Sequence, residues 1–442
     1  MIDLNNIKKV HFIGIGGIGI SALALLMHND GKIISGTNDN PSPDTLNRIR
    51  ALGVQINIGA DLAKIPPDVD LIVYSLAWDD REPDLMKAVR ALGVPVLSYP
   101  QALGLVSVAK YTIAISGTHG KTTTTAMIGE MMIAVGLDPT VVVGSLLKDI
   151  KSNFVAGQSN YFVVEACEYR RSFLNLRPKI AVITNIDNDH LDYYKDLADI
   201  QSAFAEFAEQ IPADGFLICD KNDPLLLPVL ERTKAQIIDY KKLPEIDNLL
   251  VPGKHNIKDA QCALAVAEVL KIDLAKAQNS LKKFTGTWRR FEYKGQTKMG
   301  ALVYDDYAHH PTEVGVTIEA AREFMKKNPS ADGLPGKLIV AFQPHLYSRT
   351  KLLKEDFARV LAGANEVILA PIYAAREQAD SEISSEILAE LIRLKNPNVF
   401  SLPNLIEVAK KLKEEGKSGD LVITMGAGDI GTVGDKIIEP VA

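Results

Sequence analysis

The chain has little cysteine: only Cys167, Cys219 and Cys262 occur in 442 residues, and no two of them form a CxxC pair. An odd number of widely spaced cysteines argues against a disulfide framework and against a structural zinc site. Free cysteines fit the reducing conditions of the cytoplasm, and we therefore expect a cytoplasmic protein.

Long hydrophobic runs are also missing. No stretch of about 18 uncharged apolar residues, the length that a membrane-spanning helix needs, occurs anywhere in the sequence. The segment Met1–Val10 contains Asp3, Lys8 and Lys9 and lacks the apolar core of a signal peptide. We therefore expect neither membrane insertion nor a secretory signal.

Neither sign of charge dominates the chain. Lysine and arginine total 49 and aspartate and glutamate total 55, which leaves a net charge of −6 at pH 7. Bulk electrostatics of this kind do not attract nucleic acid or an anionic membrane, and we expect neither as a partner. Negatively charged substrates must instead be bound locally, by placed lysine or arginine side chains, backbone N–H groups or metal ions.

What the chain does have is a globular composition, with 47% hydrophobic and 24% charged residues. Apolar segments of strand length alternate with helical patterns, which is typical of a parallel α/β sheet. The alternation restarts near residues 108 and 288, so we predict three domains, 1–107, 108–287 and 288–442. We predict strands at Val10–Ile15, Ile33–Ser35, Leu71–Ser75, Val94–Leu97, Tyr111–Ile115, Val141–Val143, Tyr161–Val164, Ile180–Thr184, Gly215–Cys219, Ala301–Asp305, Lys337–Phe342, Glu366–Ala370 and Leu421–Met425. We predict helices at Ser21–His28, Asp44–Leu52, Asp84–Leu92, Thr122–Val135, Ile200–Gln210, Ile257–Val269, Leu274–Phe284, Pro311–Lys326, Lys351–Leu361 and Leu405–Glu415, and a polar surface loop at Pro329–Gly336.

The first motif is a G-x-G-x-x-G turn between the first strand and the first helix. Its glycines are Gly14, Gly16, Gly17 and Gly19. Glycines at this point permit a tight turn and close approach of a diphosphate, which the start of the helix stabilises. Asp39 follows about twenty residues later, where an acidic side chain can hold a ribose hydroxyl. The motif favours nucleotide-diphosphate or dinucleotide binding over a turn that is merely tight, and it leaves the nucleotide unspecified.

The second motif, Ser116–Thr124, joins another strand to another helix and has the Gly-Lys-Thr core of a phosphate-binding P-loop. In such a loop backbone N–H groups cradle phosphates, Lys121 reaches the β- and γ-phosphates, and the Thr122 hydroxyl can bind Mg²⁺. The loop is shorter than the standard one, because Ile115 stands where the first glycine belongs. We expect its nucleotide contacts to come from Gly117, Thr118, His119, Gly120, Lys121, Thr122 and Thr123.

Further polar residues follow the ends of later strands. Glu165 ends a strand beside the P-loop, where a carboxylate can hold Mg²⁺, although alone it would suit a solvated strand end. The segment Thr184–Asp192 includes His190, which could bind a metal or orient a phosphate, although alone it would more often be a capping or surface histidine. Polar clusters also occur at Gly253–Asn256, Trp288–Glu292, Asp305–Pro311 and Gln343–Arg349. Because ligands bind outside the carboxyl ends of parallel strands, we predict that most of these segments form one composite site.

Together these segments resemble the Mur ligase family along almost the whole chain. The resemblance rests on GTHGKTTT at Gly117–Thr124, EACEYRRSFL at Glu165–Leu174, TNIDNDHLDYY at Thr184–Tyr194 and DDYAHHPTE at Asp305–Glu313. It implies a Rossmann-like N-terminal domain that binds a UDP-sugar, a central P-loop domain that binds ATP, and a C-terminal Rossmann-like domain that binds an amino acid. The member it is most similar to joins L-alanine to UDP-N-acetylmuramate for peptidoglycan synthesis, with ATP and Mg²⁺ and through an acyl phosphate.

The resemblance also implies roles for single residues. Lys121 and His190 would act at the transferred phosphate, with Thr122 and Glu165 holding one Mg²⁺ and His190 a second. Gly14, Gly16, Gly17, Gly19, Asp39 and Ser75 would contact the UDP-sugar. Asn256, Asp259, Arg290 and Asp306 would contact the nucleotide, while Tyr307, His309 and Arg349 would contact the amino acid. No residue stands out as the base that accepts the amine proton.

Three positions depart from the family pattern. Asp259 stands where an asparagine usually contacts adenine, and an ionised carboxylate can only accept hydrogen bonds. Leu346 replaces an arginine of some relatives, so fewer cations face the amino-acid carboxylate. The acid on the uridine side is either shifted to Asp39 or replaced by Asn38.

Three other functions stay open from the sequence. A ligase that recycles muramoyl peptide shares much of the pattern. An NAD-dependent oxidoreductase would use the first glycine motif but leaves the P-loop and the C-terminal third unexplained. A non-catalytic nucleotide sensor would account for Asp259 and Leu346, whereas the retention of Lys121 and Glu165 argues against it. The oligomeric state, monomer or homodimer, is not set by the sequence.

Overall fold

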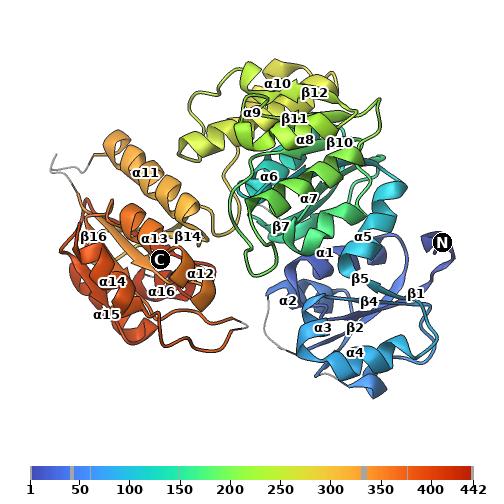
Figure 1. Cartoon of the computed structure of the whole chain (residues 1–442), viewed down its shortest axis with the longest axis horizontal. Helices are drawn as coiled ribbons and strands as arrows, with labels where there is room; N and C mark the ends of the chain where they lie inside the picture. Colours follow the sequence, from blue (N-terminus) through green and yellow to red (C-terminus); the bar gives the residue numbers. More distant parts are fainter. Residues whose placement is uncertain are drawn as a thin grey trace. The chain divides into compact units, whose positions relative to one another are not determined.

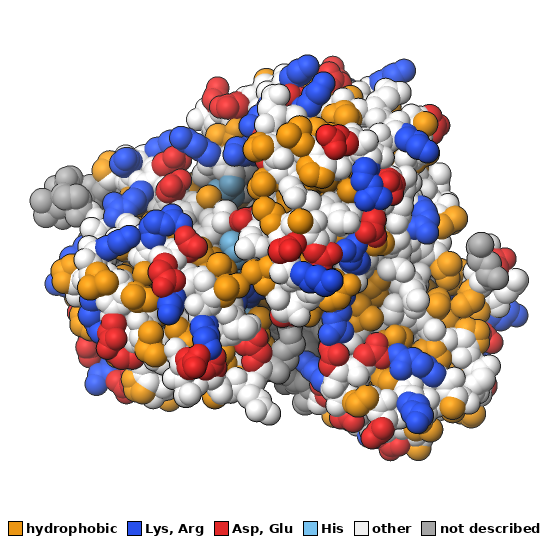
Figure 2. Space-filling model, viewed as in Figure 1, with side chains coloured by type: hydrophobic (Ala, Val, Ile, Leu, Met, Phe, Trp, Pro, Cys, Tyr) orange, Lys and Arg blue, Asp and Glu red, His pale blue; other side chains and the backbone are white. Residues whose placement is uncertain are grey.

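The computed structural model describes residues 2–39, 44–59, 61–148, 150–329, 336–375 and 377–439. These residues form two compact units, Met1–Ile246 with Asp259–Phe284 and Asp247–Lys258 with Thr285–Ala442, which are described separately (Figure 1). The interior of the expected loop Pro329–Gly336 lies outside the described residues. On the face seen in Figure 2, basic and acidic side chains are interspersed. Within the described ranges, no helix combines the length and the apolar character needed to cross a membrane.

The N-terminal sheet has five parallel strands in the order β3-β2-β1-β4-β5. One face packs Val10 and Phe12 against the helices that follow, and the other packs Ile13 against Trp78 and Met86, so both faces are covered. Helices on both faces explain why β1 and β4 are continuous apolar segments. The strands are β1 Lys9–Ile13, β2 Ile33–Asn38, β3 Gln55–Ile58, β4 Leu71–Tyr74 and β5 Val96–Ser98, and the helices are η1 Leu4–Asn6, α1 Ile18–Asn29, α2 Asp44–Ala51, η2 Leu62–Lys64, α3 Ala77–Arg81, α4 Pro83–Arg90 and α5 Tyr99–Val108.

The central sheet has seven strands in the order β12-β11-β10-β6-β9-β7-β8, and only β8 pairs in an antiparallel manner. A hydrophobic core continuous with that of the N-terminal sheet joins side chains such as Leu23 of α1 to Phe162 of β9. The elements are β6 Tyr111–Ser116, α6 Lys121–Ala134, β7 Thr140–Leu147, β8 Ser152–Val155, β9 Tyr161–Glu165, η3 Tyr169–Asn175, β10 Ile180–Ile183, α7 Leu197–Glu209, β11 Phe216–Cys219, η4 Pro224–Leu226, α8 Leu227–Arg232, β12 Gln236–Asp239, η5 Tyr240–Lys242, α9 Lys254–Val269 and α10 Leu274–Leu281.

The third sheet has six strands in the order β13-β14-β18-β15-β16-β17, parallel except for β13. Two hydrophobic cores cover its faces, one around Phe342 and Phe357 and the other around Ile339 and Leu412. The elements are β13 Glu292–Gln296, β14 Leu302–Asp306, α11 Pro311–Lys327, β15 Leu338–Phe342, α12 Tyr347–Leu352, α13 Lys354–Leu361, β16 Glu366–Leu369, α14 Ser385–Arg393, β17 Val399–Ser401, α15 Leu405–Glu415, β18 Leu421–Met425 and α16 Gly431–Ile437.

These sheets confirm the predicted α/β class, and the differences in detail have physical causes. Strands β3 and β12 are partly exposed edge strands, so they lack the apolar run that marks a buried parallel strand. The helix expected at Lys351–Leu361 is two helices that meet at Leu353. The helix expected from Ile257 begins three residues earlier, at Lys254. The division into domains at residues 108 and 288 stays a prediction.

A wholly buried histidine in β1 makes the fold sensitive to acid. His11 is 0% exposed, its Nδ1 lies 2.9 Å from Ser35 Oγ, and burial lowers the pKa of the imidazole to about 4. In the unfolded chain the histidine has an ordinary pKa near 6.5, so between pH 6.5 and 4 the unfolded state binds a proton at His11 that the folded state does not. The folded state is therefore not penalised by His11 above pH 6.5, and it loses stability as the pH falls toward 4. Substituting His11→Gln should remove about 3 kcal/mol of the pH dependence of unfolding between pH 6.5 and 4. Urea unfolding of both proteins across this range measures it, and equal slopes would contradict the assignment.

Candidate active site

The glycine loop after β1 is closed by Asn38 rather than by Asp39. Asn38 is 4% exposed, and its Oδ1 accepts a hydrogen bond from the Gly16 backbone N–H at 3.0 Å. Asp39 is exposed and instead accepts from Arg81 at 2.7 Å. Of the two alternatives that the sequence left open, the amide of Asn38 is the side chain in contact with the loop.

The glycines Gly14 and Gly19 of this loop leave no space for a side chain, because neighbouring side chains lie too close. Gly14 has φ +78°, and a Cβ there would come within 2.4 Å of the Trp78 ring and 3.3 Å of the Ser75 Cβ. A Cβ at Gly19 would come within 2.8 Å of the Tyr99 ring. These glycines let the chain pass close to Trp78 and Tyr99 as it enters α1, and a helix start of this kind attracts an anion such as a diphosphate.

The P-loop lies between β6 and α6 and depends on two glycines with positive φ. Gly117 has φ +133°, and a Cβ there would come within 2.0 Å of Thr184 Oγ1. Gly120 has φ +83° and is the residue that caps the start of α6. The first turn of α6 contains Lys121, Thr122 and Thr123, so this helix start presents N–H groups and a positive dipole to a phosphate.

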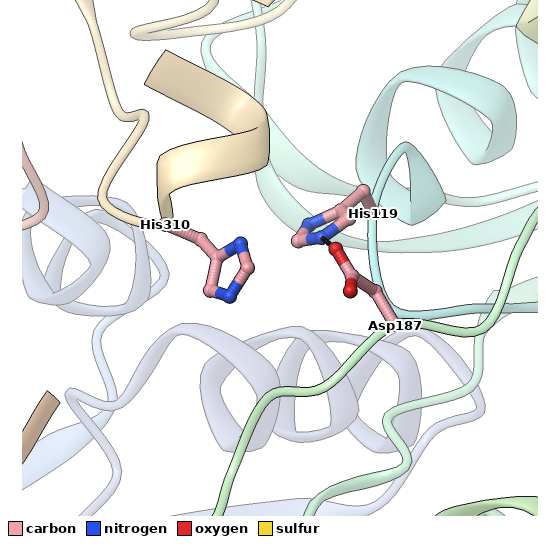
Figure 3. A group of neighbouring side chains, drawn as sticks. All are labelled: His119, Asp187 and His310. Carbon is pink, nitrogen blue, oxygen red and sulfur yellow. Dashed lines mark hydrogen bonds and ion pairs between the residues drawn. The ribbon is translucent and has the colours of Figure 1, made fainter. Parts of the chain in front are cut away.

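The segment that follows β10 holds the P-loop in place. The Asn185 Oδ1 accepts from the His119 N–H at 2.9 Å, and the Thr184 hydroxyl donates to the His119 carbonyl at 2.5 Å. The Asp187 N–H donates to Thr118 Oγ1 at 2.8 Å. His119 Nε2 lies 2.9 Å from Asp187 Oδ2. Figure 3 marks this contact with a dashed line, and the histidine ring is therefore bound by the same segment. The third residue drawn there, His310, belongs to the other unit, where it accepts from the Thr312 N–H at the start of α11.

Lys121 lies over its own loop and contacts Glu168, a residue of the segment Glu165–Leu174 for which the sequence predicted no role. Its Nζ donates to the carbonyls of Gly117 at 2.6 Å and Thr118 at 2.9 Å and to Glu168 at 2.9 Å. Burial lowers the pKa of Lys121, but the negative charge of Glu168 and its neighbours outweighs it, and the net pKa is raised. His190, with φ +56°, has its Nε2 3.6 Å from Glu168 Oε1. Glu168 thus contacts both Lys121, which is 47 residues away in the sequence, and His190.

Thr122 and Glu165 form a pair of oxygen ligands beside this lysine. The Thr122 hydroxyl lies 3.0 Å from Glu165 Oε2, and that oxygen also accepts from the Gly144 N–H of β7 at 2.7 Å. A Cβ at Gly144 would come within 2.5 Å of the Glu165 carboxylate, so the glycine is what lets the strand approach. A carboxylate and a hydroxyl held side by side are the hard ligands that Mg²⁺ prefers, and the residues present fit such an ion.

Asp259 is buried beside the P-loop rather than exposed for recognition. It is 5% exposed, and its Oδ1 accepts from the Thr124 hydroxyl at 2.9 Å. A Cβ at Gly120 would come within 2.7 Å of the same oxygen. Asn256, expected before the helix, lies inside α9, and its side-chain amide donates to the Pro252 carbonyl at 2.6 Å. Asn256 therefore lies within the first turn of α9 and does not cap the start of that helix.

In the second unit the paired arginines have different surroundings. Arg289 is 6% exposed and binds Asp305 at 2.6 Å and the Gly426 carbonyl at 2.7 Å. Arg290 is partly exposed and lies over the Tyr307 ring at 5.4 Å. Arg289 is therefore a structural residue that joins β14 to the loop after β18, whereas Arg290 keeps the exposure that a ligand contact requires.

Asp306, predicted to contact ribose, is an internal acceptor in this structure. It is 5% exposed and accepts from the backbone N–H groups of Phe291 and Ala308, both at 2.8 Å. Burial raises the pKa of this carboxyl to about 6, against the lowering effect of the nearby Arg290 charge. The carboxylate thus fixes the turn that carries Tyr307, and a ribose contact stays a prediction.

The residues predicted for the amino acid lie close together at the ends of β14 and β15. The Tyr307 and His309 rings are 5.4 Å apart, and the His309 and His345 rings are 5.8 Å apart. Arg349 Nη1 lies 3.2 Å from His345 Nδ1. Leu346 is 2% exposed with φ +69°, a conformation that costs about 1 to 3 kcal/mol in a bulky residue, and its N–H donates to the Tyr373 carbonyl.

Apart from the glycine loop after β1, the predicted site residues form two groups, one in each unit. The first surrounds the P-loop with Thr122, Glu165 and His190, and the second surrounds Tyr307 at the carboxyl ends of the third sheet. The prediction that the two groups form one composite site stays a prediction. Glu168 is the contact to which no role could be assigned from the sequence, and the choice between Asn38 and Asp39 stayed open there, because neither burial nor hydrogen-bond partners can be read from spacing.

Comparison with known families gives consecutive matches along the chain. The model "Mur ligase family, catalytic domain" matches residues 9–111, "Mur ligase middle domain" residues 115–248, and "Mur ligase, glutamate ligase domain" residues 289–428. A UDP-N-acetylmuramate--L-alanine ligase of Clostridium novyi is 41% identical, with 98% of each chain covered. An enzyme of the same name from Caldanaerobacter subterraneus is 39% identical, with 99% of each chain covered.

Solved structures agree with the sequence matches. The UDP-N-acetylmuramate-alanine ligase of Thermotoga maritima superposes with a TM-score of 0.78 at 26% identity, covering 97% of this chain and 98% of that one. This likeness confirms the predicted three-domain α/β fold with mainly parallel sheets. With three family models in order and full-length relatives near 40% identity, the chain belongs to the Mur ligase family.

Proposed function

We propose that this protein is an ATP-dependent ligase that joins L-alanine to the carboxylate of UDP-N-acetylmuramate, in peptidoglycan precursor synthesis. The observation that carries the proposal is the full-length match to ligases of that name, together with an intact P-loop cluster around Lys121. The names of these relatives favour L-alanine over the muramoyl peptide of a recycling ligase. We propose that the enzyme works in the cytoplasm, as a monomer or a homodimer.

The chemistry requires that a carboxylate, which is a poor electrophile, first acquire a good leaving group. Transfer of the γ-phosphoryl group from ATP to the substrate carboxylate gives an acyl phosphate and ADP. The amine of L-alanine then attacks the acyl carbon, and the tetrahedral intermediate expels phosphate. Transfer between two anions depends on positive charge and in-line positioning rather than on covalent catalysis, and Lys121 with the N–H groups of α6 supplies both.

Mg²⁺ is the metal that suits this reaction, and Thr122 and Glu165 would hold it, with His190 as a ligand for a second ion. Bound there, it would neutralise charge on the phosphates. The segment Thr184–Asp187 keeps the P-loop in the shape that binds phosphate, through the contacts to Thr118 and His119. Gly117, Gly120 and Thr123 complete the phosphate contacts.

The remaining ligand contacts are proposals of the same kind. Gly14, Gly16, Gly17, Gly19 and Ser75 would contact the UDP-sugar, with Asn38 closing the loop and Asp39 on its exposed side. Asn256, Asp259, Arg290 and Asp306 would lie on the nucleotide side. The group of Tyr307, His309 and Arg349 would bind L-alanine, with the guanidinium of Arg349 paired to the carboxylate.

Two functions of other classes are less well supported. An oxidoreductase would leave the pair formed by Thr122 and Glu165 without a purpose. A sensor without turnover has no need to retain Lys121 and His190 on either side of Glu168, or Glu165 beside Thr122. Asp259 and Leu346 motivate the sensor, but Asp259 is held by Thr124 and Leu346 is buried, so both have structural reasons to be present.

Phosphate release tests the proposal directly. The purified chain is supplied with Mg-ATP, UDP-N-acetylmuramate and one of several amino acids in turn. We expect release that requires the UDP-sugar and is fastest with L-alanine. Release that prefers a peptide would assign the recycling reaction, and no release while both nucleotides bind would favour the sensor.

A substitution tests the amino-acid group separately. Because Arg349 is the cation proposed for the L-alanine carboxylate, Arg349→Ala should raise the KM for L-alanine by about 100-fold, the size of a lost charge-assisted hydrogen-bond pair. The KM for ATP should change less than threefold. Arg359→Ala, on the exposed face of α13, is the control. Equal increases in both KM values would refute the assignment.

A further inference from the structure

A buried carboxylate lies beside the phosphate loop. The side chain of Glu168 is 2% exposed, and both of its oxygens lie 2.9 Å from Lys121 Nζ. Its Oε1 is also 3.6 Å from His190 Nε2. An anionic nucleotide and an anionic substrate would meet at this place, and a negative charge there weakens the binding of both. We therefore expect Glu168 to have a function that offsets this repulsion.

The ammonium of Lys121 has three donors and three acceptors. Two acceptors are loop carbonyls, those of Gly117 and Thr118, and the third is the Glu168 carboxylate. Neutral carbonyls can be exchanged for phosphate oxygens, which are charged and bind an ammonium more strongly. The carboxylate cannot be abandoned in the same way, because a buried charge without its partner is strongly destabilising.

The chain around Glu168 is fixed independently of Lys121. The Glu168 carbonyl accepts from the Tyr194 hydroxyl at 2.5 Å and from the Arg171 N–H at 2.9 Å. The next residues, Arg170 and Arg171, have φ of 51° and 54°, and Arg171 is anchored by Asp199 at 2.6 Å. Two consecutive left-handed residues persist only where the surroundings impose them, which is typical of functional sites.

We propose that Glu168 is a positioning residue for phosphoryl transfer. It keeps one N–H of Lys121 while the two directed at loop carbonyls turn to the phosphate, and it sets the direction in which these two point. Electrostatic stabilisation of a transition state depends on hydrogen-bond donors that are already oriented before the reaction. Loss of that orientation therefore lowers kcat more than it lowers ground-state affinity. This inference rests on the proposed ligase activity.

Two substitutions at Glu168 distinguish the orientation of the Lys121 ammonium from the negative charge of the Glu168 carboxylate. Glu168→Gln keeps an acceptor oxygen for Lys121, whereas Glu168→Ala keeps none. We expect kcat to fall about 10-fold in the first and at least 100-fold in the second, while the KM for UDP-N-acetylmuramate changes less than threefold. The dissociation constant of the non-hydrolysable analogue AMP-PNP, measured by calorimetry, should change less than threefold. Glu209→Gln, which alters an exposed ion pair on α7, is the matched control and should keep the kcat of the unsubstituted chain.

Several outcomes would overturn the inference. Unchanged kcat in both variants would remove any function in transfer. Tighter AMP-PNP binding by tenfold or more with kcat retained would make Glu168 a competitor of the phosphate. Equal losses in both variants, accompanied by a lowered melting temperature, would reduce Glu168 to a structural residue. An unsubstituted chain that releases no phosphate would refute the proposed function itself, whereas an active chain with insensitive variants refutes only the assignment of Glu168.

Discussion

Lys121→Ala should abolish ligase turnover, with kcat at least 1000-fold lower, while the affinity for UDP-N-acetylmuramate stays within threefold. The expectation follows from the contacts of the side chain. Its ammonium is the cation placed at the start of α6, where the γ-phosphate would lie, and removing a group that acts on developing transition-state charge costs at least 10² to 10³ in rate. The glycine loop that would bind the UDP-sugar follows β1 in another sheet, where Asn38 accepts from the Gly16 N–H.

The measurement is phosphate release at saturating substrates, with UDP-N-acetylmuramate binding followed separately by calorimetry. Lys221→Ala, a change at an exposed lysine after β11, is the control and should keep both values. A fall in UDP-sugar affinity as large as the fall in kcat would show that the proposed division of labour is wrong. A residual rate above one tenth of the original would remove Lys121 from the transfer step.

Arg289→Ala should destabilise the second unit by about 3 to 5 kcal/mol, the cost of breaking a buried ion pair by removing one partner. The guanidinium binds Asp305, which is 1% exposed, at 2.6 Å, and it donates to the carbonyls of Gly426 and Gly428 at 2.7 and 3.0 Å. Without Arg289, the buried Asp305 carboxylate loses its ion pair and keeps the hydrogen bond from the Thr424 hydroxyl, at 2.6 Å.

The two tryptophans allow this effect to be assigned to the second unit. Trp78 lies in the first unit and Trp288 in the second, next to Arg289. In a Trp78→Phe background, the fluorescence of Trp288 reports urea unfolding of the second unit. The matched control is Arg232→Ala, which removes an exposed pair with Glu209, 43% exposed on both sides, and should change stability by less than about 1 kcal/mol. An unfolding midpoint that Arg289→Ala leaves unchanged would contradict the structural assignment of this arginine.

Part of this site was predictable from the order of residues. The P-loop with Thr122 follows β6, Glu165 is the last residue of β9, and the polar turn at Asp305–Pro311 begins at the end of β14. The order of elements and the hydrophobic pattern are enough to place these residues at the carboxyl ends of strands. The partly exposed strands β3 and β12 could not be predicted in this way, because an edge strand carries no continuous apolar run.

The contacts between distant segments could not be predicted. Glu168 stands 47 residues from Lys121, and Asn38 stands 22 residues from Gly16; no local pattern distinguishes them from the acidic and polar residues beside them. The two adjacent arginines illustrate the same limit: their types and spacing are identical, yet Arg289 is buried against Asp305 and Arg290 is partly exposed.

The sequence by itself determined the α/β class, the membership of the Mur ligase family and the phosphate-binding loop, because these depend on periodicity and on short motifs that act through the backbone. Only the tertiary structure decided which charged and polar side chains meet: Asn38 rather than Asp39 at the glycine loop, Asp259 against Thr124, and Glu168 against Lys121. Partner choice among buried polar groups is set by packing, since each such group must find its hydrogen bond among neighbours that come from remote parts of the chain.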